Sequence, residues 1–119
     1  MNNSLQIVQA FSQVGASVAS IVTAVNSRKA LRRKQLIILE EELLNLSHVI
    51  RSNNIGQLVR MSILEMHKTS SYIKELHLSQ DMLPYSTNLL QIQFKMLCRN
   101  LDSYDQTSFY TDSISRYLP

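Results

Sequence analysis

The first 27 residues of the chain carry no charged side chain, and the charge that follows is concentrated in two short blocks. Residues 28–34 hold five positive charges, and residues 40–42 are three consecutive glutamates. Neither Gly nor Pro occurs between residues 16 and 55. Because Gly and Pro are the residues that most readily end a helix, their absence permits an unusually long helix at the start of the chain.

Apolar residues in the uncharged segment recur at alternating spacings of four and three, which is the pattern of one helix face. We call them the first seam: Ile7, Phe11, Val14, Val18, Ile21 and Val25. The same alternation returns in a second seam at Leu36, Leu39, Leu43, Leu46 and Ile50. We predict one continuous helix over residues 4–51, about 48 residues and roughly 70 Å long. The alternative is a break at Asn26-Ser27, two residue types that cap helices well, which gives two helices of ordinary length.

Three more helices are predicted downstream, over residues 54–78, 84–104 and, as a short terminal helix, 107–117. Helical spacing of apolar residues supports the first two, and Pro84 suits a first helical turn. The triplet Thr69-Ser70-Ser71 stands where an apolar contact is due, so we expect loose packing or a kink there. The predicted fold class is therefore all-α, a helical bundle that forms one domain over residues 1–119.

The composition supports this fold class and also bears on the cellular compartment of the protein. With two Gly and two Pro in 119 residues, the chain lacks the turn residues that hairpins need. The single cysteine, Cys98, excludes an internal disulfide, which suits a reducing compartment. We therefore expect a cytoplasmic protein, with membrane association as the alternative.

The sequence contains no pattern that indicates catalysis, a metal site or a cofactor site. His48, His67 and His77 are too widely spaced to share a helix face as metal ligands, and the three adjacent glutamates fan around a helix. Glycine-rich phosphate loops and nucleophile elbows are missing, and a lone Cys98 in a helix is typical of a small apolar residue. We predict a protein without enzymatic activity.

The first seam and the small residues around it favour a role in binding. Ala16 and Ser20, and likewise Ala19 and Thr23, are four residues apart, a spacing that lets two helices approach closely. This contact is either within the chain or between chains. We predict a helical adaptor, chaperone or scaffold whose first seam is a coiled-coil-like partner or oligomer interface.

The basic run supports a second interpretation, in which the protein acts at a membrane. Its members are Arg28, Lys29, Arg32, Arg33 and Lys34. In that case residues 5–25 insert into the bilayer while the run stays at anionic headgroups, where each cation contributes on the order of 1 kcal/mol. Polar residues opposite the first seam instead favour an amphipathic helix, and a simple solvated surface is the plainest role for the run. Nucleic acid is an unlikely partner, since stacking aromatic residues and a helix-turn-helix spacing are absent.

Overall fold

The computed structural model describes residues 2–53, 55–75 and 83–105, which form four helices of comparable length. They are α1 (Asn2–Asn26), α2 (Arg33–Ser52), α3 (Gln57–Glu75) and α4 (Leu83–Asp105). The all-α bundle is confirmed, and α4 lies where a helix was predicted over residues 84–104. The helix predicted over residues 54–78 is α3, which begins later, at Gln57; residues 54 and 76–78 of that range lie outside the described residues. The short helix predicted over residues 107–117 lies outside the described residues.

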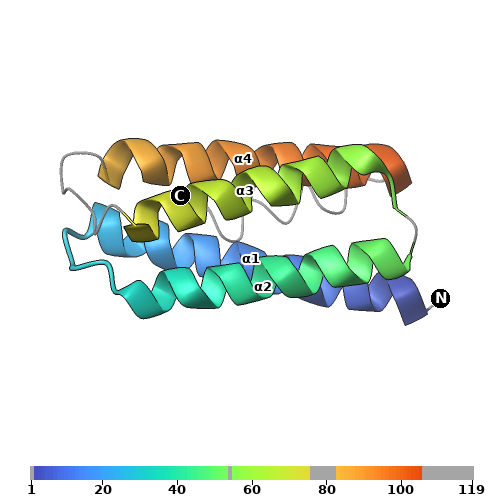
Figure 1. Ribbon diagram of the computed structural model, residues 1–119, viewed down its shortest axis with the longest axis horizontal. Helices are drawn as coiled ribbons and strands as arrows, with labels where there is room; N and C mark the ends of the chain where they lie inside the picture. The colour runs from blue at the N-terminus through green and yellow to red at the C-terminus, as the bar shows by residue number, and fades with distance from the viewer. Residues whose placement is uncertain (1, 54, 76–82, 106–119) are drawn as a thin grey trace.

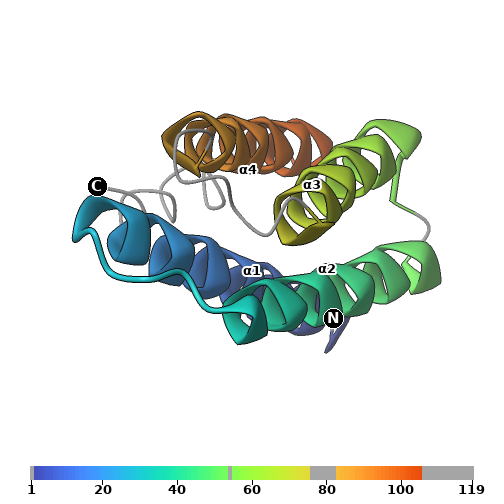
Figure 2. The ribbon, with the colours of Figure 1, turned by 60° about the vertical axis from the view of Figure 1, so that its left-hand side comes forward.

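The four helices run up and down along the long axis of the bundle in two layers (Figure 1). One layer is α1 with α2, and the other is α3 with α4, as the rotated view also shows (Figure 2). Each helix packs against the next one in the chain, and α1 also packs against α4, so the contacts close into a ring. The longest dimension of the molecule is 42 Å.

The continuous helix predicted over residues 4–51 is wrong, because the chain turns back between Asn26 and Arg33. The break near Asn26-Ser27 is the alternative that the sequence allowed. Arg28 adopts the left-handed conformation with φ 56°. Its N–H donates to Val25 O at 3.1 Å, and the N–H of Lys29 donates to Ala24 O at 2.9 Å. These two bonds are those of a Schellman motif, which ends a helix and is usually built on Gly.

A glutamine starts the next helix and holds it against the first. The backbone N–H of Arg32 donates to Gln35 Oε1 at 3.0 Å, which satisfies a donor at the start of α2. Gln35 Nε2 in turn donates to Ser20 Oγ on α1 at 2.9 Å. The joint formed by residues 27–32 is thus fixed at both ends by hydrogen bonds.

The turn from α2 to α3 begins after Ser52, near the boundary between the helices predicted over residues 4–51 and 54–78. The side chain of Asn53 donates to Val49 O at 2.7 Å, and the N–H of Ile55 reaches back to Ile50 O at 3.2 Å. Ile55 is buried, so this return of the chain also anchors it to the core.

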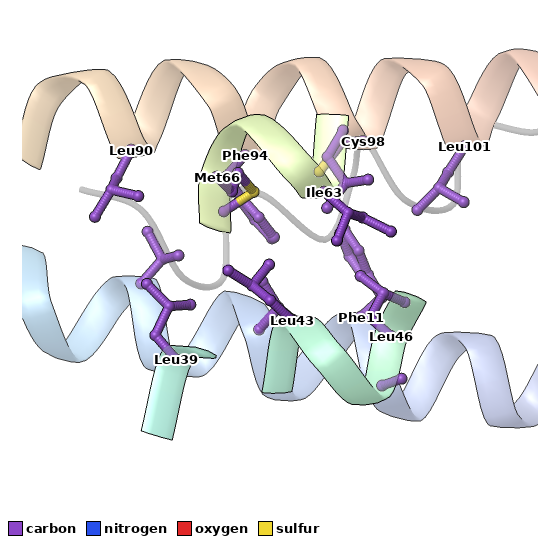
Figure 3. Packing of buried hydrophobic residues seen from close by; sticks show 14 of the residues in the cluster. Phe11, Leu39, Leu43, Leu46, Ile63, Met66, Leu90, Phe94, Cys98 and Leu101 are labelled. Carbon is purple, nitrogen blue, oxygen red and sulfur yellow. The ribbon is translucent and has the colours of Figure 1, made fainter. Parts of the chain in front are cut away.

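The core lies between the two layers and is built from the predicted seams (Figure 3). Phe11 of α1 stacks on Phe94 of α4, with ring centroids 5.0 Å apart and an interplanar angle of 14°. The second seam is completely buried, as are Leu90, Leu97 and Leu101 of α4. Not every apolar residue of α3 and α4 faces the core, since Leu58, Ile92 and Met96 are exposed.

Candidate functional site

The first seam forms the core face of α1. Ile7, Phe11, Val14, Val18 and Ile21 are buried in the bundle, and Val25 is half-buried. They are covered by helices of the same chain, since α1 packs against α2 and α4. A role for this seam between molecules stays a prediction, and it would require α1 to separate from its neighbours.

The apolar composition of α1 also bears on the membrane interpretation. Among the described residues, the segment Leu5–Asn26 is long and apolar enough to cross a membrane, with a mean hydropathy of 1.4. Half of its most apolar window is buried inside the bundle. A core helix satisfies the same criteria of length and composition, so these criteria do not separate the two roles.

The basic run lies at one end of the bundle, at and just after the joint. All five of its side chains are exposed: Arg28, Lys29, Arg32, Arg33 and Lys34. A shallow concavity of about 500 Å³ lies beside them, lined by Lys29, Arg32, Lys34 and a few apolar side chains including Ala30 and Ile38. These five exposed cations surround the connection between α1 and α2, and we call this region the basic joint.

A partly buried carboxylate links α2 to α3, and sequence analysis missed it. Glu40 accepts a hydrogen bond from Lys74 Nζ at 2.8 Å and longer ones from the hydroxyls of Ser70 and Ser71, at 3.4 and 3.3 Å. The Thr69 hydroxyl donates to Glu65 O at 3.1 Å. The polar triplet therefore continues α3 without interruption and gives Glu40 its hydrogen-bond donors, where loose packing or a kink was expected.

Burial raises the pKa of Glu40, but the hydrogen bond and charge of Lys74, with smaller contributions from His67 and Ser71, outweigh it. The pKa of Glu40 consequently lies below its ordinary value of 4.5. The carboxylate is charged at neutral pH, and all of its hydrogen-bond donors come from α3. The arrangement therefore stabilises the contact between α2 and α3.

An apolar groove lies between α2 and α3, the two helices that lie side by side in Figure 1. Its volume is about 430 Å³. Three of its lining side chains are large, apolar and mostly exposed: Leu44 (70%), Met61 (52%) and Leu64 (52%). Sequence periodicity could have flagged them, because each lies off the buried stripe of its helix.

Polar residues border the groove, and those that carry charge are basic. Arg51 and Arg60 lie toward the α2–α3 turn, and His67 lies toward the other end. The lining residues include no Asp or Glu. Neither arginine forms an ion pair with a described residue, since the ion pairs in this part of the chain join Lys68 to Glu65 and Lys74 to Glu40.

The remaining residues considered for chemistry do not come together. His48 and His67 are exposed on different helices, and His77 lies outside the described residues. Cys98 is buried in the core on α4. In the described ranges, no three His, Cys, Asp or Glu residues are grouped as metal ligands would be.

Comparison with known proteins gives no relative from which a function could be transferred. No family model, curated protein or solved structure matches the chain. Functional inference therefore rests on the surfaces of the bundle.

Proposed function

We propose that this protein is a non-enzymatic helical interaction module, an adaptor, chaperone or scaffold, and that it binds a protein partner in the α2–α3 groove. The observation that carries the proposal is the exposure of Leu44, Met61 and Leu64 around one concave surface. Clustered exposed apolar side chains are typical of interaction sites, because leaving them in water forfeits the free energy that their burial would release.

The groove is a better candidate than the first seam for two reasons. A partner can reach it without disturbing the bundle, whereas the first seam is already covered. It also includes a methionine, whose unbranched and flexible side chain adapts to partners of different shape. The buried Leu43 and Ile63 form part of its lining and also belong to the core. The exposed apolar side chains of the groove therefore lie directly over the packed core.

The test compares proteins captured from an extract of cells that produce this chain. The bait is the wild-type protein, the double variant Leu44→Glu/Leu64→Glu, or the matched control Ile92→Glu. Ile92 is 50% exposed on α4 and lies outside the groove. A binder identified with the wild type should be purified, and its affinity should fall at least ten-fold for the groove variant only. Equal affinity for all three baits would refute the proposal.

A second candidate function is peripheral binding of the basic joint to an anionic membrane. The supporting observation is that Ile37 and Ile38, 40% and 38% exposed, follow the five exposed cations in α2. Cations with nearby exposed aliphatic groups suit a lipid surface. Here α1 stays in the bundle, because inserting it would uncover the core.

Vesicle flotation tests this second candidate. Vesicles containing phosphatidylserine should retain the wild-type protein at low salt and retain progressively less of it as salt is raised, because surface charges are screened beyond about 8 Å at physiological salt. Arg32→Gln/Arg33→Gln should weaken retention, while Arg51→Gln/Arg60→Gln should not. Failure of the wild type to float with the vesicles at low salt would exclude this role.

A further inference from the structure

From the charge and dimensions of the α2–α3 groove we infer that its partner is an acidic amphipathic helix of about three turns. This inference rests on the proposed function and specifies the chemistry of the partner. Three properties of the groove support it: its apolar lining, its length and the position of its two arginines, which form no ion pair with a described residue.

The apolar lining selects a helix with one apolar stripe. Leu44 projects from α2, and Met61 and Leu64 project from α3, so the walls are apolar on both sides. A third helix laid along two packed helices contacts them through residues at i, i+3 or i+4, and i+7. An extended peptide is disfavoured, since the bundle offers no strand edge among its described residues to pair with.

The length of the groove sets the length of the helix. On α3 the lining residues extend from Gln57 to His67, which is about 15 Å at 1.5 Å per residue. Beyond His67 the contact between α2 and α3 is filled by the bond from Lys74 to Glu40. About three turns of a partner helix therefore fit between the α2–α3 turn and this polar contact.

The charge at the border of the groove selects acidic residues. Arg51 in the last turn of α2 and Arg60 in the first turn of α3 are both exposed, and both line the groove. Their guanidinium groups can bind carboxylates with two parallel hydrogen bonds. His67 adds a donor at the other end. Because no carboxylate lines the groove and both arginines lie at its end near the α2–α3 turn, an acidic partner meets attraction at that end, and a basic partner meets repulsion there.

Two synthetic helical peptides of about three turns test the inference, with binding measured by fluorescence anisotropy on the full-length chain. Both carry the same leucine stripe at i, i+3 or i+4, and i+7. One has glutamates beside the stripe, and the other has lysines at the same positions. We expect the Kd of the acidic peptide to be at least about ten-fold lower, and this preference to decrease as salt is added.

Variants separate the chemistry of the partner from the location of the site. Arg51→Gln/Arg60→Gln should remove most of the preference for the acidic peptide, whereas Lys68→Gln, which changes an exposed lysine outside the groove, should preserve it. Leu44→Glu/Leu64→Glu should abolish binding of both peptides, and Ile92→Glu should abolish neither. Circular dichroism should show that all four variants stay folded.

Each other outcome overturns a defined part of the argument. If both peptides bind equally well and the leucine variant loses both, the groove binds helices without charge selection, so the inference fails and the proposed function stands. If the acidic peptide does not bind at millimolar concentration, or binds the leucine variant equally well, both fail. If light scattering gives a dimer that Leu64→Glu dissociates, a second copy of the chain occupies the groove and the inference fails.

Discussion

Single residues decide where this chain turns, and Arg28 is the clearest example. An L-residue other than Gly pays about 1–2 kcal/mol to adopt the left-handed conformation, and Arg28 adopts it with φ 56°. The side chain of Arg28 is exposed and makes none of the hydrogen bonds that form the turn, which come from the backbone. The free-energy cost is offset elsewhere, by the core that forms once α2 folds back.

Arg28→Gly should therefore stabilise the protein. The expected gain in unfolding free energy is about 0.5–1 kcal/mol, because Gly has no Cβ to strain at positive φ. Lys34→Gly is the matched control, since it removes one positive charge in the first turn of α2, where Gly relieves no positive φ and no comparable gain is expected. Urea unfolding monitored by circular dichroism measures both. A loss of stability in Arg28→Gly would contradict the left-handed assignment.

The hydrogen bond from Lys74 to Glu40 makes the unfolding free energy depend on pH. In the folded state the pKa of Glu40 is lowered below its ordinary 4.5, so ionised Glu40 stabilises the fold above that pH. This contribution is lost as the pH falls through the lowered pKa. Lys74→Met should cost about 1–2 kcal/mol at neutral pH, as expected for a partly buried hydrogen bond to a charged group. The difference from wild type should shrink below pH 4.5.

Lys68→Met provides the comparison, because Lys68 and Glu65 form an ion pair of 3.7 Å whose side chains are 64% and 59% exposed. Removing it should change the unfolding free energy by no more than about 0.5 kcal/mol at any pH. Unfolding curves recorded from pH 3 to 7 measure both variants. A Lys74→Met effect that stays constant over this range would show that packing, and not ionised Glu40, dominates.

At the scale of the element, burial of the second seam outweighs the helix propensity of the residues that connect the two seams. Residues 28–35 are good helix formers and include neither Gly nor Pro, which is why the continuous helix was predicted. Folding back lets the second seam bury all five of its side chains, and each large aliphatic residue contributes about 1.5–3 kcal/mol when fully buried. That gain exceeds the cost of one strained residue and a few lost helical hydrogen bonds.

Ala30→Pro tests the joint directly. Ala30 lies in the connection between α1 and α2, and its backbone N–H makes none of the hydrogen bonds that hold this turn. The substitution should change the unfolding free energy by less than about 1 kcal/mol. Ser47→Pro, in the middle of α2, should cost about 3 kcal/mol or more, because proline deletes a helical hydrogen bond and clashes with the preceding turn. Urea unfolding measures both variants. If both lose a similarly large unfolding free energy, the result would support the continuous helix and contradict the turn.

At the scale of the whole molecule, the contact between the first and last described helices closes the ring. The stacked pair Phe11 and Phe94 joins the two layers across the core. The chain between them contains α2 and α3, so the pair joins two helices that are far apart in the sequence. The pair is thus a direct probe of the contact between α1 and α4.

A double-mutant cycle of Phe11→Leu and Phe94→Leu should give a coupling energy of about 0.5–1.5 kcal/mol, the range for stacked aromatic pairs. Phe94→Leu combined with Leu36→Val, in the first turn of α2, should be additive within about 0.5 kcal/mol. Thermal or urea unfolding measures each corner of the two cycles. Additivity of the phenylalanine pair would mean that the rings do not pack on each other.

Local sequence determined the helices and most of their buried faces. Spacings of three and four identify the second seam, most of the first seam and the Leu90, Phe94, Leu97 and Leu101 stripe, because a helix places such residues on one side whatever covers them. Ser52 and Asn53 mark the end of α2, since their side chains donate to backbone carbonyls of the preceding turn, His48 O and Val49 O. These features depend on contacts within a few residues.

Only the tertiary structure decided what covers each face. Whether the first seam meets another molecule or this chain's own α2 and α4 depends on contacts between residues far apart in sequence, which periodicity does not encode. Contacts between distant residues also leave Leu58 exposed and bring Leu44 and Leu64 into one groove. They likewise place the Ser70 and Ser71 hydroxyls where they donate hydrogen bonds to Glu40. A left-handed Arg28 is unfavourable alone and becomes favourable only through the core that it allows to close.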